Sequence, residues 1–210
     1  MKVYNHKLFP TLVRQYDDFL TKQQCEDIVK YVKSDEKIHE YTSHAAIKGG
    51  LGGVSSHHKI ENKDKNDEIQ QIEENVPSCS FISVSLQDAI HQYTTESGYT
   101  HCKLTQSWIN IQKEGSSLGA HTHPFSQVSG VLYLKCDDES NKLYFYNPNQ
   151  MIDSVELDKD RFTEYSYELY YFKPQVGTLI LFPSWLKHGS YGDTNKSEER
   201  IALSFNTLID

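Results

Sequence analysis

At Lys103 the sequence pattern changes to a period of two residues, and this change restricts the fold more than any other feature of the chain. From there on, short segments of alternating or continuous apolar residues follow one another, with turn residues between them. Such segments are typical of β-strands, and no stretch between them has helical periodicity. Closely spaced strands without intervening helices predict a β-sandwich or barrel. The segments are LTQSWINIQ, GAHTH, VSGVLYLK, KLYFYNP, LYYFKPQ, GTLILFP and RIALSFNTL.

The first hundred residues have a different pattern, which predicts helices. LTKQQCEDIVKYVKS has an apolar stripe with a helical repeat, and Thr21 is expected to be its N-cap. Residues 35–65 are rich in Gly, Ser, Lys and Asp, and we expect a mobile loop there. The three expected helices cover residues 20–34, a short stretch near 66–75, and a segment from Ser78 or Ser80 to about Gly98.

A length of 210 residues suits one domain. We therefore expect a single α+β domain, with residues 1–100 as a helical support and residues 101–210 as the β-core. The formal net charge of −8 argues against general binding to a nucleic-acid backbone.

Cysteine usage and hydropathy bear on location. The four cysteines form no C-x-x-C pair, as expected for free thiols in a reducing cytosol. The sequence has neither an apolar leader nor a run of 18 apolar residues, so we expect a cytoplasmic protein without a membrane span. The sequence does not indicate an oligomeric state.

Two histidines one residue apart, His121 and His123, lie in a segment that the pattern predicts to be a strand. Side chains at positions i and i+2 of a strand point the same way and lie roughly 6.5 Å apart along it. Two imidazoles at that spacing can converge on one metal ion. The alternative is a pair of solvated histidines on an exposed strand that Pro124 ends.

A third histidine favours the metal site. TLILF is a continuous apolar run and therefore predicts a buried strand that ends at Pro183, and His188 follows five residues later. Strands of one barrel can bring His121 and His188 together although 67 residues separate them. Three histidines that leave coordination positions open suit Fe(II) or catalytic zinc.

An arginine at the start of the last predicted strand is the next candidate. Arg200 shares one strand face with Ala202, Ser204 and Asn206, while the intervening residues are apolar. A guanidinium in such a place needs an anionic partner. That partner is either a small-molecule carboxylate, which Arg can bind in two parallel hydrogen bonds, or the neighbouring acidic pair at 198–199.

These motifs together resemble a known family. SWINIQKEGSSLGAHTHPFSQVSGVLYLK, KLYFYNP, GTLILFPSWLKHGS and ERIALSFN are similar to blocks of the 2-oxoglutarate- and Fe(II)-dependent oxygenases found in marine bacteria and tailed phages, within the prolyl-hydroxylase-like superfamily. The resemblance covers residues 104–207. It implies a double-stranded β-helix, or jelly-roll, core, with the N-terminal helices packed on one sheet.

The resemblance also implies roles for particular residues. The superfamily binds iron through H-x-D or H-x-E and a distal histidine, which here correspond to His121 and His188. His123 takes the position of the carboxylate, which departs from the superfamily but not from this family. Arg200 corresponds to the anchor of the distal carboxylate of 2-oxoglutarate, and Tyr133 and Ser204 are expected to contact the same cosubstrate.

The implied cofactors are Fe(II), 2-oxoglutarate and O₂, with succinate and CO₂ as products. Three neutral imidazoles would leave the site at +2, which favours a dianionic cosubstrate. The expected substrate is a protein side chain, with proline as the leading candidate, or else a small molecule. Whether His123 binds the metal is left open by the sequence.

Two other functions fit part of the pattern. A cupin-like metal protein would share Gly115 and the His-x-His motif, but its glutamate is replaced by Gln127. A zinc enzyme with a three-histidine site would also fit, but its chemistry gives Arg200 no role.

Overall fold

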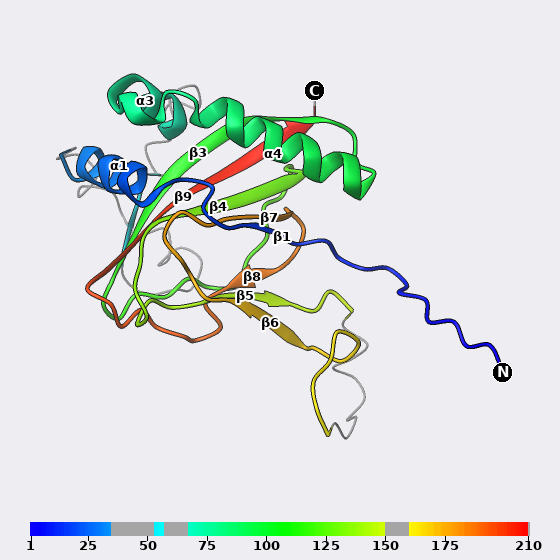
Figure 1. Cartoon of the computed structure of the whole chain (residues 1–210). Helices are drawn as coiled ribbons and strands as arrows, with labels where there is room; N and C mark the ends of the chain where they lie inside the picture. Colours follow the sequence, from blue (N-terminus) through cyan, green and yellow to red (C-terminus); the bar gives the residue numbers. More distant parts are fainter. Residues whose placement is uncertain (35–52, 57–66, 150–159, 210) are drawn as a thin grey trace.

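Two antiparallel sheets make up the core of the computed structural model, which describes residues 1–34, 53–56, 67–149 and 160–209 (Figure 1). The larger sheet has the strand order β1-β7-β4-β9-β3-β2, and the smaller sheet the order β6-β5-β8. The strands are β1 (Arg14–Tyr16), β2 (Val54–Ser55), β3 (Cys102–Lys113), β4 (Val128–Lys135), β5 (Leu143–Tyr146), β6 (Leu169–Phe172), β7 (Leu179–Pro183), β8 (His188–Gly189) and β9 (Glu199–Ile209).

Helices cover one face of the larger sheet, on the side away from the smaller sheet (Figure 1). They are α1 (Lys22–Ser34), α3 (Glu68–Asn75) and α4 (Ile82–Ser97), with a 3₁₀ turn at Pro77–Cys79. α1 contacts β4, and both α3 and α4 contact β3. Ile28 of α1 and Leu86 of α4 belong to the same buried cluster as Leu203 and Phe205 of β9. This arrangement confirms the predicted jelly roll with helices packed on one sheet.

The helix ends follow from local sequence. Thr21 caps α1, because its Oγ1 accepts from the Gln24 amide at 3.3 Å while Gln24 Oε1 accepts from the Thr21 amide at 2.9 Å. Gly98 ends α4 in the left-handed conformation, with φ of 70°. α4 begins at Ile82, later than expected, because the preceding residues form the separate 3₁₀ turn. Within the described residues, no helix is both long and apolar enough to cross a membrane.

The predicted strand GAHTH is wrong. His121 forms only an isolated bridge with His188, through two main-chain hydrogen bonds of 2.9 and 3.0 Å. The His123 amide donates instead to the Ser184 carbonyl at 2.9 Å, and Pro124 has no amide hydrogen to continue a ladder. Most of the loop predicted at 35–65 lies outside the described residues. Its described part includes β2, at the edge of the larger sheet.

Gly130 of β4 lets the Phe205 ring pack directly against the strand. A Cβ at this position would overlap the ring. Gly130→Ala is therefore expected to destabilise the fold by about 1–3 kcal/mol, the usual cost of overpacking a core. Denaturant unfolding measures this loss. The double variant with Phe205→Leu is the control, because a smaller side chain makes room and should leave less than the sum of the two single losses.

Candidate active site

A cavity of about 440 Å³ opens beside the larger sheet, and it is lined by side chains of β3, β4 and β9 and by the segment that carries the first two histidines. Alternation along β9 puts five of its side chains on the cavity wall, four of which the sequence had placed on one strand face, while intervening residues such as Leu203 and Phe205 pack in the hydrophobic core. The five are Arg200, Ala202, Ser204, Asn206 and Leu208.

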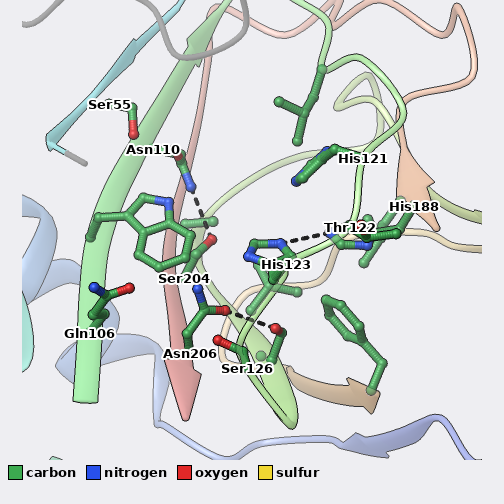
Figure 2. Close-up of a pocket in the computed structure, with 18 of the residues that line it drawn as sticks. Ser55, Gln106, Asn110, His121, Thr122, His123, Ser126, His188, Ser204 and Asn206 are labelled. Carbon is green, nitrogen blue, oxygen red and sulfur yellow. Dashed lines mark hydrogen bonds between the residues drawn. The ribbon is translucent and has the colours of Figure 1, made fainter. Parts of the chain in front are cut away.

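The structure brings the three predicted histidines together at this cavity. One ring nitrogen of each of His121, His123 and His188 lies within 4.8 Å of the others. His123 Nε2 lies 3.2 Å from His188 Nε2, as the dashed line in Figure 2 marks. Bonds of about 2.1 Å at right angles would separate two ligand nitrogens by about 3 Å, so this pair already has a spacing suited to one metal ion.

Main-chain carbonyls fix which nitrogen two of the imidazoles offer. His121 Nδ1 lies 2.9 Å from the Gly119 carbonyl oxygen, and His188 Nδ1 lies 2.8 Å from that of Leu186. If Nδ1 carries the proton and donates, the lone pair of Nε2 is left for a metal, as in most histidine ligands. Burial lowers the pKa of His188 to about 3, and the neighbouring His121 adds to this effect. His188 is therefore neutral, the state that binds metal.

Glycine at 189 holds the first histidine segment against β8. A Cβ on Gly189 would lie 2.9 Å from the carbonyl oxygens of both Leu118 and Gly119. Only glycine leaves room for that close approach, which places His121 beside His188. Trp108 supports His123 from the other side, since the two rings stack with centroids 5.9 Å apart.

Arg200 lies at the far end of the cavity, next to Tyr133. It is 9% exposed and donates to the Gln112 side-chain oxygen. Its guanidinium carbon lies 5.0 Å from the centre of the Tyr133 ring. Neither Arg200 Nε nor Tyr133 Oη has a hydrogen-bond partner among the described residues, although both atoms are buried. Two buried donors without acceptors fit a bound carboxylate.

Of the two acidic residues that were the alternative partners of Arg200, Glu199 pairs with other cations. Glu199 binds Lys33 at 2.6 Å and Lys135 at 2.9 Å. Burial raises the pKa of Tyr133 although the Arg200 charge acts against it, so the phenol keeps its proton and can donate. Arg200 and Tyr133 therefore offer the charge and the donors that a carboxylate of 2-oxoglutarate requires.

Ser204 lines the middle of the cavity, but its nearest polar partner is an asparagine. Asn110 Nδ2 donates to Ser204 Oγ at 2.9 Å (Figure 2). Gln112 was not among the residues predicted for the site. The alternation of β3, which puts Trp108, Asn110 and Gln112 on one face, could have indicated it.

Replacement of His123 by aspartate tests whether this residue is a metal ligand. His123→Asp is expected to keep Fe(II) binding or tighten it by up to about tenfold, or about 1.4 kcal/mol, because a negative charge then lies beside the cation. Anaerobic Fe(II) titration measures the affinity, with His91→Asp on the exposed face of α4 as control. If aspartate abolishes binding while alanine at 123 does not, His123 is not a ligand.

Comparisons with known proteins support one class of chemistry. Residues 106–206 match the family model described as "Putative 2OG-Fe(II) oxygenase". This match covers both histidine blocks and Arg200, and it favours oxygenase chemistry over the cupin-like and zinc alternatives. No curated protein matches the chain.

Solved structures share the fold at low sequence identity. A Pseudomonas putida prolyl-4-hydroxylase is similar with a TM-score of 0.62 and 13% identity, over 95% of this chain and 94% of that chain. A Trichoplax adhaerens prolyl hydroxylase, solved with a hypoxia-inducible-factor peptide, has a TM-score of 0.62 and 13% identity over 93% and 83%. Streptomyces hygroscopicus HygX, with nickel, 2-oxoglutarate and hygromycin B bound, has 0.61 and 10% over 95% and 83%.

Proposed function

We propose that the chain is a 2-oxoglutarate- and Fe(II)-dependent dioxygenase that hydroxylates a side chain of a peptide or protein, with proline as the leading target. In this proposal His121, His123 and His188 hold the iron. Arg200 binds the distal carboxylate of 2-oxoglutarate, with help from Tyr133 and Ser204.

One observation carries the proposal. The same cavity is lined by a cluster of three histidine nitrogens and by the buried Arg200, and neither Arg200 Nε nor the Oη of its neighbour Tyr133 has a hydrogen-bond partner among the described residues. A metal chelated by the 2-oxo acid end of a dianion, whose other carboxylate meets Arg200, would use both features at once. A cupin-like metal site or a zinc site would use only the first.

The cosubstrate balances the reaction, because it takes up one of the two oxygen atoms of O₂. When bound, Fe(II) and 2-oxoglutarate activate O₂, so that one oxygen atom enters succinate and the other enters the C–H bond of the substrate, with release of CO₂. The protein orients the reactants. Arg200 and its partner Gln112 fix one end of the cosubstrate, and Trp108 and Phe182 keep the cavity wall apolar beside the histidines.

The choice of a peptidyl substrate rests on the prolyl hydroxylases that share the fold, one of which was solved with a peptide. A small-molecule substrate is the second candidate, because HygX was solved with hygromycin B. The proposal also treats the chain as one domain, since α1, α4 and the larger sheet share a buried cluster. The proposal also includes an origin in marine bacteria or phages, which rests on the resemblance of the sequence blocks. It includes a cytoplasmic location, which rests on the cysteine usage and hydropathy of the sequence.

Anaerobic titration with Fe(II), with and without 2-oxoglutarate, tests the class of cosubstrate. The expected result is a metal-to-ligand charge-transfer absorption band that needs both components, and slow succinate formation without substrate once O₂ is admitted. When zinc replaces iron, both the absorption band and succinate formation should be absent. Iron binding without any response to 2-oxoglutarate would contradict the proposal and leave the cupin-like alternative.

A further inference from the structure

The cavity has two chemically different ends, both built on β3 and β9. In the register of these strands Gln112 lies opposite Arg200, and Gln106 lies opposite Asn206. All four side chains line the cavity. The first pair is buried and holds the cationic group. The second pair is made of two carboxamides and lies toward the solvent, since Gln106 is exposed. If the cosubstrate occupies the Arg200 end, the substrate meets the carboxamide end.

Asn206 is held in one orientation by the strand beside it. Its side chain is only 6% exposed, and its Oδ1 accepts from Ser129 Oγ at 2.8 Å. Ser129 is in turn bonded to Ser184 at 2.7 Å. Because its oxygen is used in this network, the Nδ2 of Asn206 lies on the other side of the carboxamide from the bonded oxygen (Figure 2). No described residue accepts from this amide, so a ligand can.

The outer end of the cavity is also uncharged. Among the described residues that line the cavity there is no aspartate, glutamate or lysine, and the single arginine belongs to the cosubstrate end. A charged ligand group at the outer end would lose hydration without gaining an ionic partner. Carboxamides and hydroxyls, by contrast, match the donors and acceptors of an amide group.

An exposed aromatic residue stands at the rim of this end. Phe125 is 94% exposed and has φ of 69°, a backbone region that residues other than glycine adopt only at an energetic cost. It lies two residues after His123 and lines the cavity. An exposed apolar ring on a backbone held in such a region fits contact with the apolar part of a ligand.

We propose that the carboxamide end of the cavity, formed by Gln106 and Asn206 with Phe125 at its rim, binds the uncharged main chain of the substrate peptide. Asn206 Nδ2 donates to a main-chain carbonyl, and Gln106 pairs with a neighbouring peptide group. Phe125 covers the target side chain. This inference rests on the proposed function, and it makes Asn206 and Gln106 specificity-determining residues that select a residue within a chain over a free amino acid.

Three ligands, one uncharged and two zwitterionic, test the inference on the protein loaded anaerobically with Fe(II) and 2-oxoglutarate. They are acetyl-Gly-Pro-Gly-amide, unblocked Gly-Pro-Gly and free L-proline, and calorimetry gives each dissociation constant. The blocked peptide is expected to bind at least about tenfold tighter than either charged ligand. Asn206→Asp should weaken binding of the blocked peptide about tenfold or more, because the donor becomes a charged acceptor. Gln106→Leu should weaken it less.

The charge-transfer band separates the possible failures. Its absence in the wild-type protein would refute the oxygenase proposal itself, whereas its presence in each variant shows that the loaded site is folded. Asn75→Asp, at an exposed position on α3, is the control that should change nothing. With the band present, the inference is overturned if the blocked peptide does not bind, if L-proline binds as tightly, or if Asn206→Asp binds the blocked peptide like wild type.

Discussion

Alanine at His188 is expected to lower Fe(II) affinity more than about 100-fold, because loss of groups that only orient metal ligands already costs 10- to 100-fold. The His188 ring lies near those of both other histidines, with centroids 4.4 Å from His121 and 5.0 Å from His123. It is also neutral and almost fully buried. Anaerobic titration measures the loss, and His121→Ala should give a similar one.

The test needs a folding control, because His188 also packs against Phe182 and Phe145. Circular dichroism and a cooperative unfolding transition establish that each variant is folded. His91→Ala removes an exposed imidazole from α4 and should bind iron as the wild type does. If both His121→Ala and His188→Ala keep wild-type affinity, the metal site lies elsewhere.

Replacement of Arg200 should affect the cosubstrate and not the metal. A charge-assisted hydrogen bond contributes roughly 1.5–3 kcal/mol, so Arg200→Ala is expected to raise the dissociation constant of 2-oxoglutarate by about one to two orders of magnitude. Fe(II) affinity should stay nearly unchanged, because the histidines lie at another part of the cavity. Titration of the charge-transfer band with 2-oxoglutarate measures the effect.

Two further variants make that experiment specific. Arg200→Lys should recover part of the affinity, since it restores the charge without the planar pair of donors. Lys135→Ala removes a cation from the neighbouring strand that pairs with Glu199, and it should leave 2-oxoglutarate binding as it is. Binding that does not respond to Arg200→Ala would move the anchor to another residue while leaving the enzyme class in place.

Local patterns predicted most of the fold. β4 has the bounds expected from its apolar run, and Thr21 and Gly98 mark the helix ends where capping chemistry placed them. The histidine motif was assigned to a strand because its alternation matches one. The actual segment has no continuous partner strand, and His121 and His123 bond to two different places on the chain.

The rest of the site depends on pairings between distant residues. Gln112 and Arg200 are 88 residues apart, and only the register of β3 with β9 puts them face to face. Asn206 was placed on the correct strand face, but its orientation comes from Ser129, 77 residues earlier. A single sequence holds no record of such register, so the composition of the cavity could be predicted only in part.

The register of β3 and β9 has a consequence for size selection. Arg200 and Asn206 are six residues apart on one strand, or about 20 Å at the usual rise per residue, and this separation is set by the covalent chain. The width of the cavity between them is set instead by replaceable side chains, such as Trp108 and Ala202. The combined length of the two ligands is therefore a fixed requirement, whereas the bulk that each can have beside the metal can change through single substitutions. We therefore expect related chains with the same two strands to differ much more in the width of the substrates they accept than in the combined length of substrate and cosubstrate.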